Sequence, residues 1–260
     1  MRVKDETIDE SGNVDDFDPL VESLEPISDS EHFTTEPGLP VDARGNVPEG
    51  LAIRVQRTAK HTKPRGLVFS VQADGGVAKQ VMFAEPHGWT TAGSQQTLVF
   101  ERGGPSTGPT VGSVNFHAWL ADQRKGDVEI HEAQGDRMHL KATGMSATHH
   151  FEMHGKTYIW RRTHGTGEDK TFWKSHLECV NEAEQVYAFY TGDKHKADSG
   201  HEITVGRFEI KAADLRPEFV EVLLMTFVAM FVKLQKRMLE ESHSGIAGKL
   251  ASKALYSIGG

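Results

Sequence analysis

Three residues spaced two apart along one segment have the chemistry of metal ligands: His150, Glu152 and His154. Alternate side chains of a β-strand point to the same face, so a strand here would place all three on one side of a sheet. Imidazole and carboxylate groups bind zinc, and they also form 2-His-1-carboxylate iron centres. This arrangement indicates one alternative function, a metal-dependent enzyme of cupin-like type.

The wider sequence favours a simpler interpretation of this cluster. The chain contains 14 histidines, so some must fall close together. The cupin order, His-x-His followed by Glu and a later His, is absent from the sequence. We therefore expect a solvated strand face that binds no metal ion, and no cofactor is expected.

A second group of residues has the chemistry of an anion-binding surface. A hairpin turn at Gly165 to Gly167 should bring together the two strands that carry these basic residues. A basic side chain near an anionic membrane contributes about 1 kcal/mol, so such a patch predicts weak lipid binding. Charges on a strand edge that deter aggregation are the other interpretation. The patch consists of Lys156, Arg161, Arg162, Lys170 and Lys174.

No other segment carries a catalytic signature. The glycine-rich stretches 103–112 and 165–171 lack the Lys-Ser/Thr ending and the following helix of a phosphate-binding loop. The single cysteine, Cys179, cannot form an internal disulfide, and its strand context predicts a packed thiol in a reducing compartment. The first residues, MRVKDETIDE, contain no apolar signal region. We therefore expect a non-enzymatic protein of the cytoplasm or nucleus.

The charge of the chain is unevenly distributed. Residues 1–45 contain 13 acidic and three basic groups, a net charge of −10. Residues 46–260 then contain 24 acidic and 26 basic groups, a net charge of +2, whereas the whole chain carries −8. An acidic segment with few apolar residues cannot bury enough surface to fold, so residues 1–45 are predicted to be a disordered tail. The nearly neutral remainder lacks the basic excess of nucleic-acid-binding proteins, and no nucleic acid is expected as a partner.

The residues that position these groups lie in short β-rich segments. About twelve such segments follow one another between Leu51 and Ile210, separated by turns rich in Gly, Pro, Asp and Asn. Turns of this length join antiparallel strands, because parallel strands need longer helical crossovers. The pattern predicts an antiparallel sandwich or barrel.

One helix stands apart from these strands, and its sequence is FVEVLLMTFVAMFVKL, from Phe219 to Leu234. Between Val222 and Val232 the only polar side chain is Thr226, so apolar groups must surround the helix on all sides. Its apolar part would be about 24 Å long, and strands of six to eight residues span about 20 to 26 Å. A barrel of twelve strands is too wide for its own side chains to fill. The sequence thus predicts a helix at 216–240 that occupies the centre of a closed barrel.

The ends of this helix agree with the assignment. Asp214 is suited to cap its N-terminus, and Pro217 is suited to the first turn. The alternative is a tail anchor in a membrane through residues 217–234, although a membrane span usually needs about 20 apolar residues.

Four segments, in order, resemble the tubby C-terminal-like superfamily, and most of all its uncharacterised fungal branch. They read GKTYIWRR, TFWKSHLEC, VYAFYTG and VGRFEIKAADLRPEFVEVLLMTFVAM. The superfamily includes tubby proteins, plant LURP-one-related proteins and phospholipid scramblases. The resemblance implies a closed barrel of about twelve strands around a central helix. It also implies a phosphoinositide-binding, membrane-peripheral role. The lipid-binding positions of tubby proteins have no match here, and the calcium and Cys-rich segments of scramblases are missing.

Together these observations predict one domain with two tails. Residues 1–45 form the acidic tail, residues 46–241 form the tubby-like barrel, and residues 242–260 form a C-terminal tail that could contain a short helix. We expect a non-enzymatic module that binds anionic membrane lipids or a protein partner.

Overall fold

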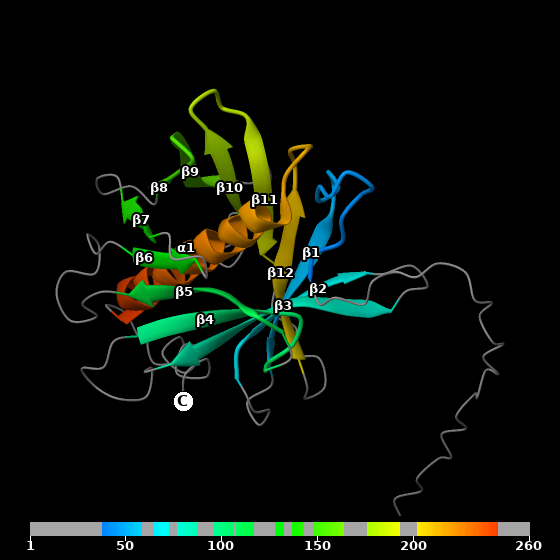
Figure 1. The fold of residues 1–260 in the computed structure, drawn as a ribbon. Coiled ribbons are helices and arrows are strands. Elements are labelled where there is room, and N and C mark those ends of the chain that lie inside the picture. Colours follow the sequence, from blue (N-terminus) through cyan, green and yellow to red (C-terminus); the bar gives the residue numbers. More distant parts are fainter. Residues whose placement is uncertain are drawn as a thin grey trace, which may run out of the picture. The chain divides into compact units, whose positions relative to one another are not determined.

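Residues 36–260 form one unit of the chain, and residues 1–35 are set apart from it. The computed structural model describes parts of residues 36–260 only, and the other residues are drawn in grey in Figure 1. The predicted acidic tail therefore lies outside the described residues, except for residues 38–45. The described residues are 38–58, 65–72, 77–87, 96–106, 108–116, 128–132, 137–142, 148–163, 176–192 and 202–243.

Twelve strands and one helix make up the regular structure of these described residues, as the sequence predicts. The strands are β1 (Ala52–Thr58), β2 (Leu67–Gln72), β3 (Ala78–His87), β4 (Gln96–Arg102), β5 (Thr110–Phe116), β6 (Val128–Glu132), β7 (Arg137–Ala142), β8 (His149–Met153), β9 (Lys156–Thr163), β10 (His176–Asn181), β11 (Val186–Gly192) and β12 (Glu202–Ile210). The helix is α1 (Pro217–His243).

The strands form a closed barrel in which every neighbouring pair is antiparallel. Each strand pairs with the next one along the chain, and β1 completes the circle by pairing with β12. Ile53 of β1 lies opposite Phe208 of β12 in this closing pair. The predicted fold class, a closed antiparallel barrel, is therefore confirmed.

Alternation along each strand separates an inner face from an outer face. In β4, the side chains of Gln96, Leu98 and Phe100 are buried inside, whereas the residues between them are partly exposed. A β-bulge interrupts the pairing of β4 with β5 after Phe100, and another interrupts β10 and β11 between Cys179 and Val180. Bulges of this kind increase the twist and bend that a closed barrel needs.

Helix α1 passes through the centre of the barrel, as Figure 1 shows. Every residue from Val220 to Val232 is buried. A run of this length includes side chains on all sides of the helix, so the helix is enclosed all round. Close packing extends to the backbone of β5, because a Cβ atom added to Gly112 would lie 2.8 Å from the Met225 sulfur. The predicted central helix at 216–240 is confirmed, and its observed bounds are Pro217–His243.

The helix begins differently from the sequence-based prediction. Pro217 is its first residue, and the Arg216 carbonyl accepts hydrogen bonds from the Phe219 and Val220 amides. Asp214 is not the N-cap, because it lies two residues further back with a positive φ of 56°. Its carboxylate instead accepts a hydrogen bond from the Asn46 side-chain amide, 3.4 Å away.

The segment before β1 is attached to the start of this helix. Val47 forms an isolated antiparallel bridge with Leu215. The Asp42 carboxylate accepts hydrogen bonds from the Asn46 and Arg44 amides, and these contacts, the first above all, lower the pKa of Asp42. Residues 38–45, assigned to the acidic tail from sequence, thus include a turn that contacts the barrel domain.

Among the described residues, no helix combines the length and the apolar character that crossing a membrane requires. Residues 217–234, for which a tail anchor was the alternative prediction, lie within α1. The apolar character of this stretch has another physical cause, since its side chains pack against the inner faces of the strands.

Candidate functional site

Helix α1 fills the interior of the barrel, and the polar side chain in the middle of this helix, that of Thr226, has a hydrogen-bond partner on the strands. Trp160 of β9 donates a hydrogen bond from Nε1 to the Thr226 hydroxyl, 2.9 Å away. That hydroxyl in turn lies 2.9 Å from the Val222 carbonyl, to which it can donate. Both side chains are buried, so the pair fixes the rotation and depth of α1 in the barrel.

Aromatic rings surround this hydrogen bond. The Phe227 ring packs against rings from three strands, with centroid distances of 6.0 Å to Trp160, 4.5 Å to Tyr190 and 5.3 Å to Phe208. These contacts join β9, β11 and β12 to the same turn of α1. The centre of the barrel is therefore occupied by packed side chains, and a ligand would have to bind elsewhere on the described structure.

An ion pair lies near the end of the barrel at which α1 begins. Arg102 of β4 donates to both carboxylate oxygens of Glu221, at 2.5 Å and 2.9 Å. The Glu221 side chain is only 6% exposed, whereas that of Arg102 is 34% exposed. Bidentate geometry of this kind compensates for the desolvation of a buried carboxylate. We interpret this pair as a structural contact between the helix and the strands.

The basic residues predicted from sequence do not all lie together on the described surface. Lys156 and Arg162 are both exposed, but they occupy the two ends of β9, about 20 Å apart. Arg161 lies on the outer face, since its neighbour Trp160 points inward. Lys170 and Lys174 lie outside the described residues.

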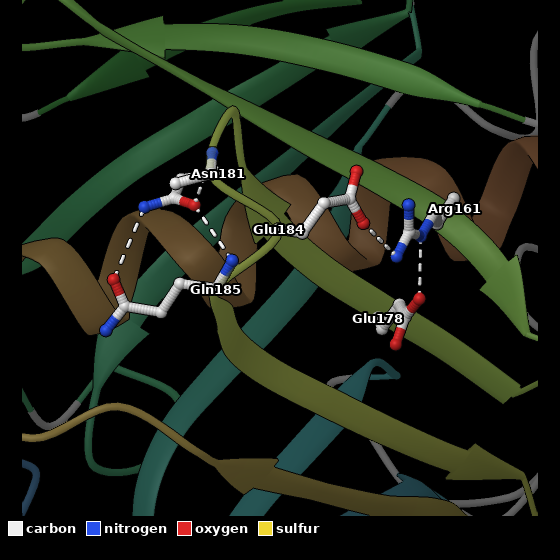
Figure 2. A network of polar contacts seen from close by, with 6 residues as sticks. Arg161, Glu178, Asn181, Glu184 and Gln185 are labelled. Carbon is white, nitrogen blue, oxygen red and sulfur yellow. Dashed lines mark hydrogen bonds and ion pairs between the residues drawn. The ribbon is translucent and has the colours of Figure 1, made fainter.

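Arg161 is held by two carboxylates, which Figure 2 shows. Its Nε lies 2.6 Å from Glu178 on β10, and its terminal nitrogen lies 2.6 Å from Glu184. Arg161 and Glu178 are direct partners in the register of β9 and β10. The hydrogen bonds that Arg161 donates to Glu184 and, to a smaller extent, to Glu178 raise the pKa of Arg161. The charge of this arginine is thus largely compensated within the protein.

Glu184 reaches Arg161 because a rigid turn holds it there. The turn joins β10 to β11, and the Asn181 side-chain oxygen accepts hydrogen bonds from the Ala183 and Gln185 amides at 3.0 Å and 2.9 Å (Figure 2). Glu184 itself has a positive φ of 60°. Sequence reasoning missed both acidic partners of Arg161. For Glu178 the signal was present, because pairing the two strands of the predicted hairpin in register would have placed it opposite Arg161.

The proposed metal ligands do not form a metal site. His150 and Glu152 lie on the outer face of β8, as the strand pattern predicts, and His154 lies in the following turn with a φ of 50°. Among the described residues, no three His, Cys, Asp or Glu side chains are grouped so that they could hold a metal ion. The physical reason is that β8 ends at Met153, so the alternation that would align the three side chains on one face does not extend to His154.

Cys179 points into the barrel core. Its side chain is fully buried, and burial raises the pKa of the Cys179 thiol well above its ordinary value. A thiol in this state is neither a ready nucleophile nor a metal ligand. The structure agrees with the prediction of a packed thiol.

Taken together, the described residues define a closed twelve-strand antiparallel barrel around a central helix, with its polar and charged groups mainly on the outside. Comparisons with family models, with curated proteins and with solved structures found no match to this chain.

Proposed function

We propose that this protein is a non-enzymatic binding module of the tubby-like type that attaches to anionic membrane lipid through exposed basic side chains of its barrel. One observation carries the proposal: α1 fills the barrel, so its central space holds side chains where a barrel enzyme would hold substrate. The resemblance in sequence to tubby-like proteins supports the choice of lipid, and phosphoinositides are the lipids to test first.

The proposed lipid contacts are the exposed basic residues of β9 and two lysines of the following segment, which lies outside the described residues. Lys156 and Arg162 are exposed at the two ends of the strand, and Lys170 and Lys174 follow in the sequence. Arg161 contributes less, because Glu178 and Glu184 already compensate its charge. Four basic residues at about 1 kcal/mol each supply about 4 kcal/mol, which corresponds to a dissociation constant of about 1 mM. The proposed attachment is therefore weak and sensitive to salt.

Flotation of the full chain with vesicles tests this proposal. The vesicles contain phosphatidylcholine alone, phosphatidylcholine with phosphatidylserine, or phosphatidylcholine with a phosphoinositide. We expect recovery with both anionic mixtures, reduced by 0.5 M salt. Equal recovery with neutral and anionic vesicles, or none with any of them, contradicts lipid binding and leaves a protein partner as the function to pursue.

A matched pair of variants then locates the surface. The double substitution Lys156→Gln and Arg162→Gln removes two exposed basic groups from β9. The control, Arg54→Gln and Lys79→Gln, removes two exposed basic groups from β1 and β3. Both variants change the net charge equally, so a loss of flotation confined to the first assigns binding to the β9 region. An equal loss in both variants shows that only net charge matters.

A further inference from the structure

Four histidines lie on one outward surface of the barrel that the function proposed above does not use. His131 belongs to β6, His139 to β7 and His150 to β8, and His154 lies in the turn after β8. We call this surface the histidine face. Ile130 before His131 is buried, and so are the residues on both sides of His139 and of His150, which places these three histidines outside.

The strand pairings make this surface continuous. Across β6 and β7, His131 lies opposite Arg137 and His139 lies opposite Glu129. Across β7 and β8, His150 lies opposite Lys141. Adjacent strands are about 4.8 Å apart, so the histidines are spread over the outer wall of the barrel rather than converging on one point.

The charged groups on the histidine face balance one another when the imidazoles are neutral. Two carboxylates, Glu129 and Glu152, accompany two cations, Arg137 and Lys141. Glu129 lies 3.2 Å from the His131 ring nitrogen Nε2 and 3.8 Å from Arg137.

The strands on either side add no charge to the histidine face. On β5, Ser113 lies opposite His131 and Asn115 opposite Glu129. On β9, Ile159 lies opposite His150 and Thr157 opposite Glu152. The further charges on the described strands are those of Glu132, which follows His131 on β6, of Lys156, which begins β9 after the His154 turn, and of Arg161, which is already paired. The net charge of the face therefore depends on its imidazoles.

Histidine is the side chain whose ordinary charge change falls between pH 5 and 8, whereas carboxylates ordinarily stay ionised at pH 5.5. Mild acid can therefore add positive charge to a surface that is otherwise balanced, above all at the exposed His139 and His154, because Nε2 of His131 is buried beside Glu129. The spacing that prevents these residues from sharing one metal ion suits a bilayer, in which each cation meets a separate headgroup.

We propose that the histidine face is a second membrane-docking surface, which strengthens attachment to anionic lipid bilayers when the pH falls from about 7.4 to about 5.5. This inference rests on the proposed function, since it assumes that the occupant is an anionic bilayer. Charge complementarity supports that occupant: the face gains only positive charge on acidification, and it presents that charge over three adjacent strands.

The test compares two double variants with the unmodified full chain. The first, His139→Gln with His154→Asn, removes the two exposed histidines of the face, and asparagine tolerates the positive φ of position 154. The control, His87→Gln with His195→Asn, removes the exposed His87 of β3 and His195, which lies outside the described residues. The control is needed because any protein becomes more cationic in acid. Circular dichroism at both pH values confirms that each variant is folded.

Binding is measured by flotation with vesicles of phosphatidylcholine containing 30% phosphatidylserine, at pH 7.4 and pH 5.5 and low salt. We expect the unmodified chain and the control to bind more tightly at pH 5.5. The His139/His154 variant should keep its affinity at pH 7.4 and bind about thirtyfold more weakly than the unmodified chain at pH 5.5, as expected for two charges near a membrane at about 1 kcal/mol each.

Each remaining outcome has a definite meaning. Binding at pH 7.4 without strengthening in acid overturns the histidine face but not the proposed function. Absence of binding at both pH values overturns both. Strengthening that survives in the His139/His154 variant, or that is lost equally in the control, assigns the effect to another surface. Equal acid binding to vesicles of phosphatidylcholine alone also overturns it, because such binding would not depend on anionic lipid.

Discussion

Two arginine–glutamate pairs, one inside the barrel and one outside, have similar geometry in different surroundings. Arg102 and Glu221 join β4 to α1, and Arg161 and Glu178 join β9 to β10, with closest nitrogen–oxygen distances of 2.5 Å and 2.6 Å. The two arginines are almost equally exposed, at 34% and 36%. The carboxylates differ, because Glu221 is 6% exposed and Glu178 is 17% exposed, with the 65% exposed Glu184 beside it.

The contrast shows how the two faces of the barrel differ in their tolerance of change. The inner groups have the helix as their common partner, so loss of one contact leaves a group that water cannot easily reach. The outer groups are paired with neighbours on adjacent strands, and water can replace any of them. Substitutions inside should therefore lower stability, whereas those outside should mainly alter binding.

The largest expected effect comes from placing a charge inside the barrel. Thr226→Lys, or Ala229→Lys, should leave the domain unfolded, because an unpaired ammonium group cannot be accommodated in a dry core. Circular dichroism and a thermal melt measure the result. The control is Thr157→Lys on the outer face of β9, which should fold normally. A folded Thr226→Lys variant with an unchanged melting temperature would contradict the helix-filled barrel.

The inner ion pair gives the next largest effect. Arg102→Ala should lower the free energy of unfolding by about 3 kcal/mol, the lower end of the range for breaking a buried pair, since Arg102 is one-third exposed. The cost arises from the Glu221 carboxylate, which would remain buried without its cation. Urea denaturation measures the change. If Arg102→Ala and Arg161→Ala cost the same, the inner and outer pairs are equivalent and the distinction drawn above is wrong.

A smaller effect is expected from the hydrogen bond at the centre of the barrel. Thr226→Val keeps the side-chain shape but removes the acceptor for Trp160 Nε1, so the unfolding free energy should fall by about 1 to 3 kcal/mol. In the double variant with Trp160→Phe, the total loss of unfolding free energy should be smaller than the sum of the two single losses, because both substitutions remove the same interaction. Strict additivity would show that the hydrogen bond itself contributes little.

The smallest change in stability is expected at the outer pair. Arg161→Ala should lower the unfolding free energy by at most about 1 kcal/mol, and 1 M salt should reduce that difference. A loss above 2 kcal/mol that is insensitive to salt would mean that the Arg161 network supports the fold as the inner pair does. The two denaturation curves, with and without salt, decide between these results.

The sequence was sufficient to predict the inner face of the barrel and much less of the outer face. An all-round apolar helix needs a complete apolar enclosure, and twelve short strands can supply it, so the enclosed helix followed from pattern alone. Thr226 appeared as the single polar exception in that helix, and the structure explains it by its bond to Trp160.

The outer face depends on which residues face each other across strands. In the sequence, nothing next to Arg161 indicates that its charge is paired. In the fold, Glu178 of β10 lies opposite it, and Glu184 of the following turn forms an ion pair with it. That turn places Glu184 at positive φ, a conformation that its residue type does not signal. Asp214 is a second case that the sequence alone did not reveal. Aspartate is a common N-cap residue, but in the folded protein the Asp214 carboxylate accepts a hydrogen bond from the Asn46 side chain.

The pairing of β1 with β12, which closes the barrel, has a consequence for how the protein folds while it is being synthesised. Of the described strands, β1 leaves the ribosome first and β12 last, and α1 follows β12. Until then the nascent sheet has an open edge at β1 and an apolar inner face without its helix. Exposed edges and apolar faces are the features that lead to aggregation, so this chain should rely on chaperones until its synthesis has passed α1.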